Sequence, residues 1–352
     1  MKILVINPGS TSTKIAIFED EKLIYDKNPS HSLEELEKYE KVTDQYDLRK
    51  EVILECLAEA GIDPRDLDAC VGRGGLLRPL DGGTYRVSEK LLADAHAGVS
   101  GEHPSNLGSI LANEIASKFG KPSFIVDPVV VDEITDVARI SGHPLMPRRS
   151  IFHALNQKAM VRKYARENGT KYSDVNVIVA HMGGGISIGM HNHGRVVDVN
   201  NALDGEGPFT PERSGTLPVG KIIELCFSGQ YSLKEMKQMA KGKGGVIAYF
   251  GTNDMKALED RRFDEPEVQL IVDAMAYQVA KYIGSMATVV SGKVDAIILT
   301  GGIAYSKYMT GEIKNRVEFI APVHVYPGEE EMSALAGGAL RVLRGEEEAK
   351  TY

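Results

Sequence analysis

One pattern occurs twice in this chain, and it constrains the fold more than any other feature of the sequence. Its first copy comprises apolar runs at 2–7, 14–18 and 22–25, with the turn-forming cluster 8–12 after the first run. Its second copy comprises apolar runs at 175–180, 186–190 and 195–199, with the glycine-rich turn 181–185 after the first run. Short apolar runs at hairpin spacing predict a three-stranded meander. The copies lie about 174 residues apart, with a two-residue slip at the second turn, so we interpret them as a duplicated domain.

Helix and strand patterns alternate through the rest of the chain. Helical spacing of apolar residues is found at 48–60, 88–97, 105–118, 154–167, 216–228, 232–240, 265–290, from about 305, and at 330–344. Further strands are predicted at 68–72, 123–127, 294–300 and 322–326. Such alternation indicates α/β layers, and 352 residues exceed one ordinary core of about 150 residues. We therefore predict an α/β protein with one domain at 1–150, completed by the closing helix at 333–352, and a second domain at 151–332.

Composition and charge argue against several classes of protein. The net charge is −8 and basic residues occur in runs no longer than two, whereas a nucleic-acid binder usually carries a basic stripe. Cys56, Cys70 and Cys226 show no C-x-x-C spacing, so they give no zinc signature and suit a reducing compartment. No apolar stretch approaches the ~20 residues of a membrane span, and the first apolar run is too short for a signal peptide. We expect a cytoplasmic protein that binds neither nucleic acid nor membrane.

The two turns at 8–12 and 181–185 are candidate phosphate sites. A tight turn between strands directs several backbone N–H groups to one side, and neighbouring hydroxyls add donors, which suits a phosphate group. Neither turn is a Walker loop, and neither opens a helix as a dinucleotide fingerprint requires. Each turn taken alone is more often a plain hairpin turn, but two of them in duplicated domains favour a nucleotide site. A third segment, 297–303, is a strand end that can admit a base or ribose.

Three glycine-bearing segments, taken in order, resemble those of a known superfamily. They are Asn7-Pro8-Gly9-Ser10, His181-Met182-Gly183-Gly184-Gly185 and Thr300-Gly301-Gly302-Ile303. This order is similar to that of the actin-like ATPases, which include sugar kinases, Hsp70 and actin. Within them, the acetate and butyrate kinase family is the most similar, over the whole length. The sequence Asn-Pro-Gly-Ser-Thr-Ser-Thr-Lys at 7–14 resembles the butyrate kinase branch.

The resemblance implies a fold and a reaction. The fold would be two duplicated actin-like (ribonuclease H-like) domains with a nucleotide cleft between them, the second domain binding most of the nucleotide. The reaction would be phosphorylation of a short-chain fatty acid carboxylate by ATP with Mg²⁺, in which butyrate and ATP give butyryl phosphate and ADP by direct in-line transfer. The protein would form a homodimer or a higher homo-oligomer.

The resemblance also implies roles for individual residues. The catalytic group comprises Arg73, Arg213, Asp127, His153 and His103. The nucleotide would be bound by Asn7, Ser10, Ser12, Lys14, His181, Gly183, Gly184, Gly185, Gly301 and Gly302, with Asp254, Met255 and Lys256 near the adenine. Asn7 and Glu331 would support the magnesium ion, and the acyl pocket would be lined by Phe152, Gly74 and Gly75.

The chemistry of the reaction agrees with these roles. Phosphoryl transfer between two anions is limited by charge repulsion and positioning, so arginines that clamp carboxylate and phosphoryl oxygens are natural catalysts. A carboxylate is already an unprotonated nucleophile at neutral pH, so no strong general base is needed. Asp127 would accordingly orient an arginine or a magnesium-bound water.

The sequence departs from the acetate kinase pattern at three places. Acetate kinases carry a catalytic histidine in His-Asn-Pro-x-Asn, whereas this chain has Glu102-His103-Pro104-Ser105-Asn106, in which the histidine is displaced by one position. Gly184 stands where acetate kinases have an asparagine. Gly74 and Gly75 stand where they have two valines, one of which lines the methyl pocket, so we expect room for a longer acyl chain here.

Simpler interpretations exist for most of these residues. Arg73 and Arg213 can be structural ion-pair arginines, His153 a buried structural histidine, and Asp127 a strand stop. The glutamates at 329–331 begin a helix, where acidic residues favour the dipole in any case. His191 and His193 resemble a metal pair, but their place at a hairpin turn predicts that they face solvent.

Other functions are also open from the sequence alone. An acetate, propionate or branched-chain fatty acid kinase is the nearest alternative. An actin- or Hsp70-like nucleotide-gated assembly protein is the alternative from a different class. A Rossmann dehydrogenase is disfavoured, because no G-x-G-x-x-G opens a helix.

Overall fold

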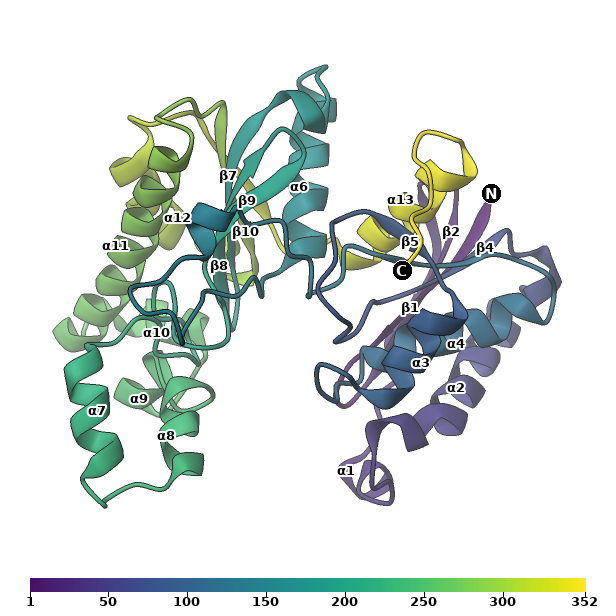
Figure 1. The fold of residues 1–352 in the computed structure, drawn as a ribbon, viewed down its shortest axis with the longest axis horizontal. Helices are drawn as coiled ribbons and strands as arrows, with labels where there is room; N and C mark the ends of the chain where they lie inside the picture. Colours follow the sequence, from purple (N-terminus) through teal and green to yellow (C-terminus); the bar gives the residue numbers. More distant parts are fainter. The chain divides into compact units, whose positions relative to one another are not determined.

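The computed structural model describes residues 1–352, which form two compact units. Unit 1 comprises Met1–Val131 and Glu330–Tyr352, so both ends of the chain belong to it, and unit 2 comprises Asp132–Glu329. Each unit is a sheet covered by helices, as the alternation of strand and helix patterns predicts (Figure 1).

The sheet of unit 1 has six strands in the order β3-β2-β1-β4-β6-β5. They are β1 (Lys2–Pro8), β2 (Thr13–Glu19), β3 (Lys22–Lys27), β4 (Ala69–Gly72), β5 (Thr84–Arg86) and β6 (Ser123–Val126). The meander β1-β2-β3 is antiparallel, β1, β4 and β6 run parallel, and β5 pairs antiparallel with β6. The predicted first meander is confirmed, and β5 is an additional strand that the sequence did not predict.

Helices cover both faces of this sheet. They are α1 (Leu33–Leu36), α2 (Tyr46–Glu59), α3 (Glu89–Ala97), α4 (Asn106–Ser117) and α13 (Glu331–Leu343). Leu4 and Ile6 of β1 belong to one core with α2 and α4. Alternate strand residues point to opposite faces, so Ile3 and Val5 are buried on the other face. That face is covered by α13, which contacts β1, β4, β5 and β6 (Figure 1).

The sheet of unit 2 repeats this topology in five strands, β11-β10-β7-β8-β9. They are β7 (Asn176–Met182), β8 (Ile186–Asn192), β9 (Arg195–Val199), β10 (Ala296–Gly301) and β11 (Val323–Pro327). β7-β8-β9 is again an antiparallel meander, and β10 is parallel to both β7 and β11. The register of the outer hairpin shifts between Ile17 and Phe18 in β2 and between Met190 and His191 in β8, which are equivalent places in the two copies. The duplication predicted from the sequence is therefore present in the fold.

The expected two-residue slip between the copies is wrong in its place and size. The second turns of the two meanders are equally long, at 20–21 and 193–194. The copies differ instead at the first turn, which spans 9–12 in unit 1 and 183–185 in unit 2. The glycine-rich turn of unit 2 is tighter by one residue.

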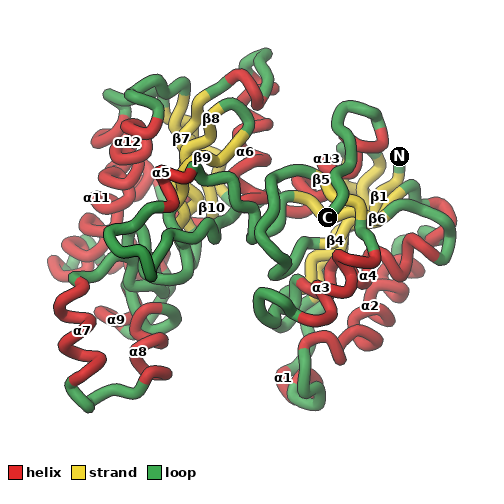
Figure 2. Tube along the Cα trace, viewed as in Figure 1, coloured by secondary structure: helices red, strands yellow, loops and turns green.

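The helices of unit 2 also lie on both faces of their sheet. They are α5 (Asp136–Arg139), α6 (Ala154–Glu167), α7 (Val219–Phe227), α8 (Leu233–Ala240), α9 (Val246–Phe250), α10 (Met255–Arg261), α11 (Pro266–Val289) and α12 (Lys307–Val317). Ile178 and Ala180 of β7 pack with α11 and α12, whereas Val177 and Val179 pack with α6. Figure 2 shows α6 and α11 on opposite sides of the strands. No helix is both long and apolar enough to span a membrane.

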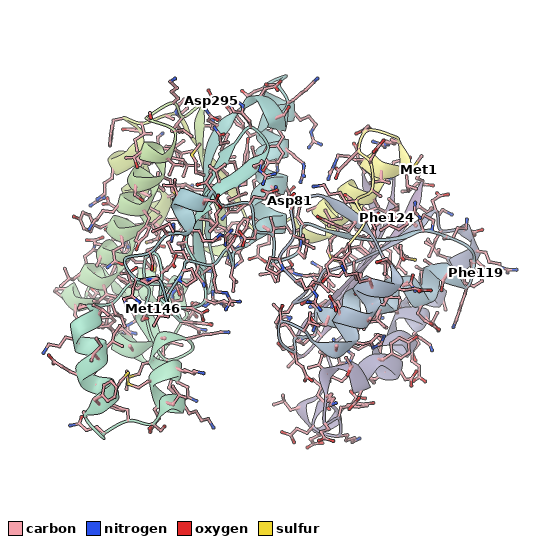
Figure 3. The ribbon with its side chains drawn as sticks, in the orientation of Figure 1. Met1, Asp81, Phe119, Phe124, Met146 and Asp295 are labelled. Carbon is pink, nitrogen blue, oxygen red and sulfur yellow. The ribbon has the colours of Figure 1, made fainter.

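The division between the units differs from the expected boundary at residue 150. Residues 132–150 belong to unit 2, where Met146 lies in Figure 3. Glu133 forms a buried ion pair with Lys158 of α6, with an N–O distance of 2.9 Å. Arg148 forms a partly exposed ion pair with Asp198 of β9. These contacts fix the segment to the second sheet, although it has almost no regular secondary structure of its own.

Candidate active site

Three predicted site residues of unit 1 lie where its parallel strands end. Asn7 lies near the end of β1, Arg73 follows β4, and Asp127 follows β6. The backbone N–H of Arg73 donates to Ile6 O at 2.9 Å, which continues the β1–β4 pairing. Carboxyl ends of parallel strands meet at one edge of a sheet, and α/β proteins commonly bind ligands at that edge.

Glu331 joins this edge from the first turn of α13. Asn7 Nδ2 donates to Glu331 Oε2 at 2.9 Å, and the Arg73 guanidinium forms an ion pair with the same carboxylate. A carboxylate at the start of a helix is also favoured by the helix dipole. The structure therefore brings together one predicted catalytic residue and both predicted magnesium residues.

A buried arginine that the sequence did not single out holds the first turn. Arg49 of α2 is fully buried and donates to Gly9 O at 2.9 Å, Ser12 O at 2.8 Å and Thr13 Oγ1 at 2.9 Å. Burial lowers the pKa of Arg49 to about 10. Two carbonyl groups of the turn, those of Gly9 and Ser12, thus point to Arg49. Ser10, a predicted phosphate-binding residue in the same turn, is exposed.

Asp127 and His103 have contacts of their own. Asp127 is buried with φ of 38°, and its Oδ1 accepts from Gly83 N at 2.7 Å, which fixes the loop before β5. His103 is exposed, and its Nδ1 lies 2.7 Å from Ser105 Oγ. These contacts give both residues a local structural role, and their catalytic roles stay predictions.

The loop after Arg73 is pressed against the start of α4. A side chain at Gly75 would meet the backbone and Oδ1 of Asn106, and one at Gly74 would meet Pro128. Asn106 is buried and its Oδ1 accepts from Leu76 N at 2.7 Å. Neither glycine has a positive φ, so their small size serves a close approach of two backbones.

In unit 2 two predicted histidines stack on each other. The rings of His153 and His181 have centroids 3.8 Å apart and planes inclined by 12°. His181 is buried in β7, with Nδ1 2.8 Å from Asn156 Oδ1 and Nε2 3.2 Å from Glu329 Oε1, without hydrogen-bond geometry in the latter contact. His153 Nδ1 lies 2.9 Å from Ser187 Oγ in β8. Phe152, the predicted acyl-pocket residue, is buried beside this pair in the chain.

Arg213 lies beneath the glycine turn of the same unit. A side chain at Gly185 would meet the Arg213 guanidinium, and Arg213 Nη1 donates to Ala202 O at 2.6 Å. Thr210 fixes this arrangement, because its hydroxyl donates to Gly184 O at 2.6 Å and accepts from Arg213 N at 3.0 Å. Burial lowers the pKa of Arg213 from its ordinary value.

Three buried polar atoms of these unit 2 residues lack a hydrogen bond. Asn156 Nδ2, His181 Nε2 and Arg213 Nε are buried and make no hydrogen bond. Buried polar groups are rarely left unpaired, because each costs about 1–3 kcal/mol. Phosphate oxygens would supply acceptors for the arginine and amide donors, so the polar atoms present fit an anionic ligand.

The remaining nucleotide residues are placed by the backbone of unit 2. Gly301 has φ of 88°, exchanges hydrogen bonds with Gly328 and leaves no space for a side chain beside Met182. Gly302 faces open space. Asp254 caps α10 by accepting from Ala257 N at 3.0 Å, while Met255 packs on the core and Lys256 is exposed.

Asn7 and Glu331 offer the kind of donor that magnesium prefers. Mg²⁺ is commonly bound by one or two carboxylates together with phosphate oxygens and water. No cluster of three or more His, Cys, Asp or Glu side chains that could hold a metal is found in the structure. One carboxylate and one amide therefore fit a magnesium ion that arrives with ATP, not one enclosed by protein ligands.

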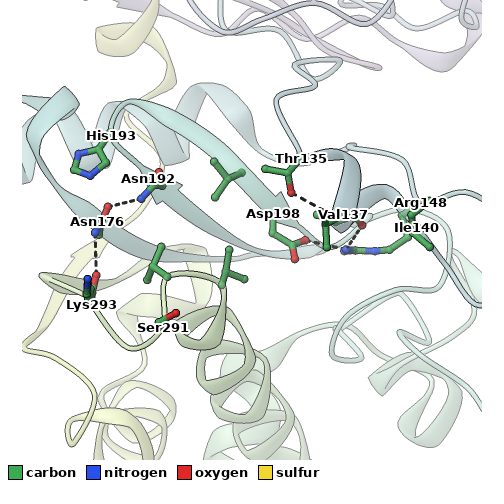
Figure 4. A pocket seen from close by; sticks show the side chains of 14 residues that line it. Thr135, Val137, Ile140, Arg148, Asn176, Asn192, His193, Asp198, Ser291 and Lys293 are labelled. Carbon is green, nitrogen blue, oxygen red and sulfur yellow. Dashed lines mark hydrogen bonds and ion pairs between the residues drawn. The ribbon is translucent and has the colours of Figure 1, made fainter.

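A pocket of about 710 Å³ in unit 2 lies apart from these residues (Figure 4). Its one arginine, Arg148, is already occupied by Asp198, Glu206 and two backbone carbonyls. None of the predicted site residues lines it. Its contacts do not favour a phosphate site.

His191 corrects one expectation from the sequence. It is fully buried in β8 and does not face solvent, whereas His193 in the following turn is exposed. His191 Nε2 lies 3.1 Å from Gln157 Oε1, and His191 Nδ1 lies 2.8 Å from Tyr172 Oη. The sequence also missed Asn156, Gln157 and Ser187. The only signal for the first two was that they form a polar pair soon after Phe152-His153.

Comparisons with known proteins agree with this geometry. The chain matches the Acetokinase family over residues 137–321. It is 57% identical over 352 residues to butyrate kinase 2 and to butyrate kinase 1 of Clostridium acetobutylicum. Each alignment covers 100% of this chain and 99% of the relative.

Solved structures show the same fold. Acetate kinase from Porphyromonas gingivalis has a TM-score of 0.78 at 18% identity, covering 97% of this chain and 99% of that one. Acetate kinase from Entamoeba histolytica has a TM-score of 0.75 at 17% identity, covering 96% of this chain and 98% of that one. From its sequence matches, supported by this actin-like α/β fold, the chain belongs to the Acetokinase family, the family of acetate and butyrate kinases.

Proposed function

We propose that this protein transfers the γ-phosphoryl group of ATP to the carboxylate of butyrate, giving butyryl phosphate and ADP. The observation that carries the proposal is the 57% identity to two butyrate kinases over the whole chain. The arginines and phosphate-type turns of the two units support the same chemistry from the structure.

The reaction joins two anions. A carboxylate oxygen forms a bond to the γ-phosphorus as the bond from that phosphorus to the bridging oxygen breaks, and ADP leaves with the electron pair. Arg73 and Arg213 would offset the charge on the transferring group, because preorganised cations in a water-poor site stabilise developing charge strongly. His153 would donate a hydrogen bond to the same group, and Asp127 would keep its loop in place. Magnesium held by Asn7 and Glu331 would neutralise phosphate charge.

ATP would contact residues of both units. The turn at 9–12 and Lys14 offer donors in unit 1, and the turn at 183–185 with His181 offers donors in unit 2. Gly301 and Gly302 would admit the nucleoside, and Asp254, Met255 and Lys256 would lie near the adenine. The protein is proposed to act as a homodimer or a higher oligomer in the cytoplasm.

A hydroxamate assay with straight and branched acids from two to six carbons tests the proposal. Acyl phosphate should form only with ATP and Mg²⁺. Butyrate should exceed acetate by roughly tenfold in kcat/KM, since each added methylene contributes about 0.8 kcal/mol on burial. Maximal activity with acetate, propionate or a branched acid would assign the substrate differently. Absence of carboxylate-dependent ADP release would overturn the kinase and favour a nucleotide-gated assembly protein.

A further inference from the structure

A chain of hydrogen bonds in unit 2 runs from a partly buried tyrosine to the stacked histidines. It connects Tyr172, His191, Gln157, Ser187 and His153, and each contact is 3.1 Å or shorter. Only His153 among these residues was predicted to meet the phosphoryl group. The chain matters because each of its members offers a limited number of donors and acceptors, so the position of every proton can be worked out.

The orientation of Gln157 is fixed by a backbone carbonyl. Gln157 Nε2 lies 3.0 Å from Ser187 O and 2.8 Å from Ser187 Oγ. A carbonyl oxygen only accepts, so the amide must present its NH₂ group to Ser187 and its oxygen to His191. His191 Nε2 therefore carries a proton and donates to Gln157 Oε1.

His191 is the neutral end of this chain. Burial, with help from the positive charges of Lys158 and Arg162, holds the pKa of His191 well below its ordinary value. With its one proton on Nε2, the ring accepts at Nδ1 from the Tyr172 hydroxyl. Gly189 leaves the space through which Gln157 reaches this ring, since a side chain there would meet Gln157 Oε1.

The hydroxyl of Ser187 then has one direction left for its own proton. Ser187 Oγ accepts from Gln157 Nε2 at 2.8 Å and from His153 N at 3.4 Å, which occupies both of its lone pairs. Its remaining neighbour is His153 Nδ1 at 2.9 Å, so the hydroxyl donates there. His153 Nδ1 is an acceptor, and the proton of the neutral ring lies on Nε2.

We propose that Ser187 and Gln157 are positioning residues that hold His153 in its Nε2–H tautomer, as a neutral hydrogen-bond donor to the phosphoryl group. Stacking on His181 fixes the plane of the His153 ring, and Ser187 fixes its rotation within that plane. The role as donor to phosphate rests on the proposed function, whereas the tautomer does not. A donor suits the reaction, because the carboxylate nucleophile has no proton for a base to remove.

The tautomer is measured directly by long-range ¹H–¹⁵N correlation on protein labelled with [¹⁵N]histidine and free of substrate. The His153 signals are identified by their loss in His153→Gln. We expect a protonated Nε2 and an unprotonated Nδ1. A protonated Nδ1 in the neutral ring would overturn the proposal, whatever reaction the protein catalyses.

Ser187→Ala tests the consequence for catalysis. We expect a mixture of tautomers, a roughly tenfold lower kcat and KM values within about twofold of wild type, since one positioning hydrogen bond is lost and no substrate contact. Ser123→Ala is the matched control: it removes a buried hydroxyl that donates to Asn113 Oδ1 at 3.0 Å in unit 1. Wild-type tautomer and turnover in a folded Ser187→Ala would contradict the assignment. If that variant does not fold, the wild-type spectrum still decides it.

Discussion

Arg73 and Arg213 carry the same charge in different surroundings. Arg73 is half-buried and already paired with the Glu331 carboxylate. Arg213 donates to a backbone carbonyl and has a buried Nε that makes no hydrogen bond. A buried guanidinium nitrogen without an acceptor is costly, so Arg213 gains more from an anionic ligand than Arg73 does. Arg73 would have to exchange or share its carboxylate when substrate binds.

Removing either arginine should abolish most of the activity. We expect Arg73→Ala and Arg213→Ala each to lower kcat by roughly 10²-fold or more, because cations placed on a transferring phosphoryl group contribute several kcal/mol. Arg65→Ala and Arg316→Ala are matched controls, since both remove exposed arginines paired with a nearby carboxylate. Steady-state kinetics with circular dichroism of each variant provides the measurement. Near-wild-type turnover would remove that arginine from the catalytic group.

The residues that the sequence could reveal are those that occur in a motif. Asn7, Arg73 and Glu331 follow strand patterns or begin a helix, and the structure brings them together. Arg49 and Gln157 could not be found in this way, because a polar residue in a helix pattern is usually on the surface. Only the packing of the helix on the sheet shows that both are fully buried.

Burial of His191 should make the stability of the protein depend on pH. Its pKa is lowered by burial and by Lys158 and Arg162, so the folded protein keeps the ring neutral where the unfolded chain binds a proton. The free energy of unfolding therefore keeps this contribution in full above a pH of about 6.5, the pKa of histidine in the unfolded chain. It loses the contribution as pH falls below that value, by up to about 1.4 kcal/mol per pH unit.

Urea unfolding at about pH 5.5, 6.5 and 7.5 compares wild type with His191→Phe, the residue type at the equivalent place in β2. The variant should lose less stability on acidification. His31, whose pKa is also lowered by burial and by Arg49, stays in both proteins and so cancels in the comparison. Equal slopes in the two proteins would show that His191 does not titrate on unfolding in this range.

At the scale of elements, most helices and strands follow from local patterns, and β5 does not. Thr84–Arg86 is only three residues long, too short for an apolar alternation to be recognised. The strand exists because of distant partners: it pairs with β6, and Tyr85 forms a bridge with Lys350 near the end of the chain. The loop 73–76 is likewise defined by α4, which no local pattern could indicate.

The packing of this loop changes what a substitution at Gly75 should do. A glycine-to-valine change in an open pocket would select for shorter acids, but at Gly75 the side chain would meet the backbone of Asn106. We therefore expect Gly75→Val to reduce activity on acetate and butyrate alike, with a lower melting temperature, because overpacking commonly costs about 1–3 kcal/mol. Gly220→Val in α7, where a side chain meets nothing, is the control. A selective loss on butyrate in a stable Gly75→Val variant would restore the pocket interpretation.

At the scale of the whole molecule, one fold occurs twice, and the two copies carry different site residues. The two sheets share strand order and even the position of a register shift. The first copy ends its parallel strands in Asn7 and Arg73, and the second holds the histidine stack. The duplication was predictable, since it is encoded in local strand patterns. The boundary near residue 132 was not, because Glu133 and Arg148 assign their segment to unit 2 through distant partners.

A duplicated fold that serves one reaction should respond to ATP in both copies. We expect Mg²⁺-ATP to raise the melting temperature, since a ligand at about 100 times its Kd stabilises the native state by about 2.7 kcal/mol. Hydrogen exchange should slow at 7–14 in unit 1 and at 181–186 in unit 2. Adenosine, which lacks phosphates, should protect residues of unit 2 near 254–256 and 301–302 and leave exchange at 7–14 unchanged. Omission of Mg²⁺ should weaken the protection by ATP around Asn7 and Glu331. Protection by Mg²⁺-ATP confined to one unit would mean that the other contributes no phosphate contacts, and the roles proposed for its residues would have to be withdrawn.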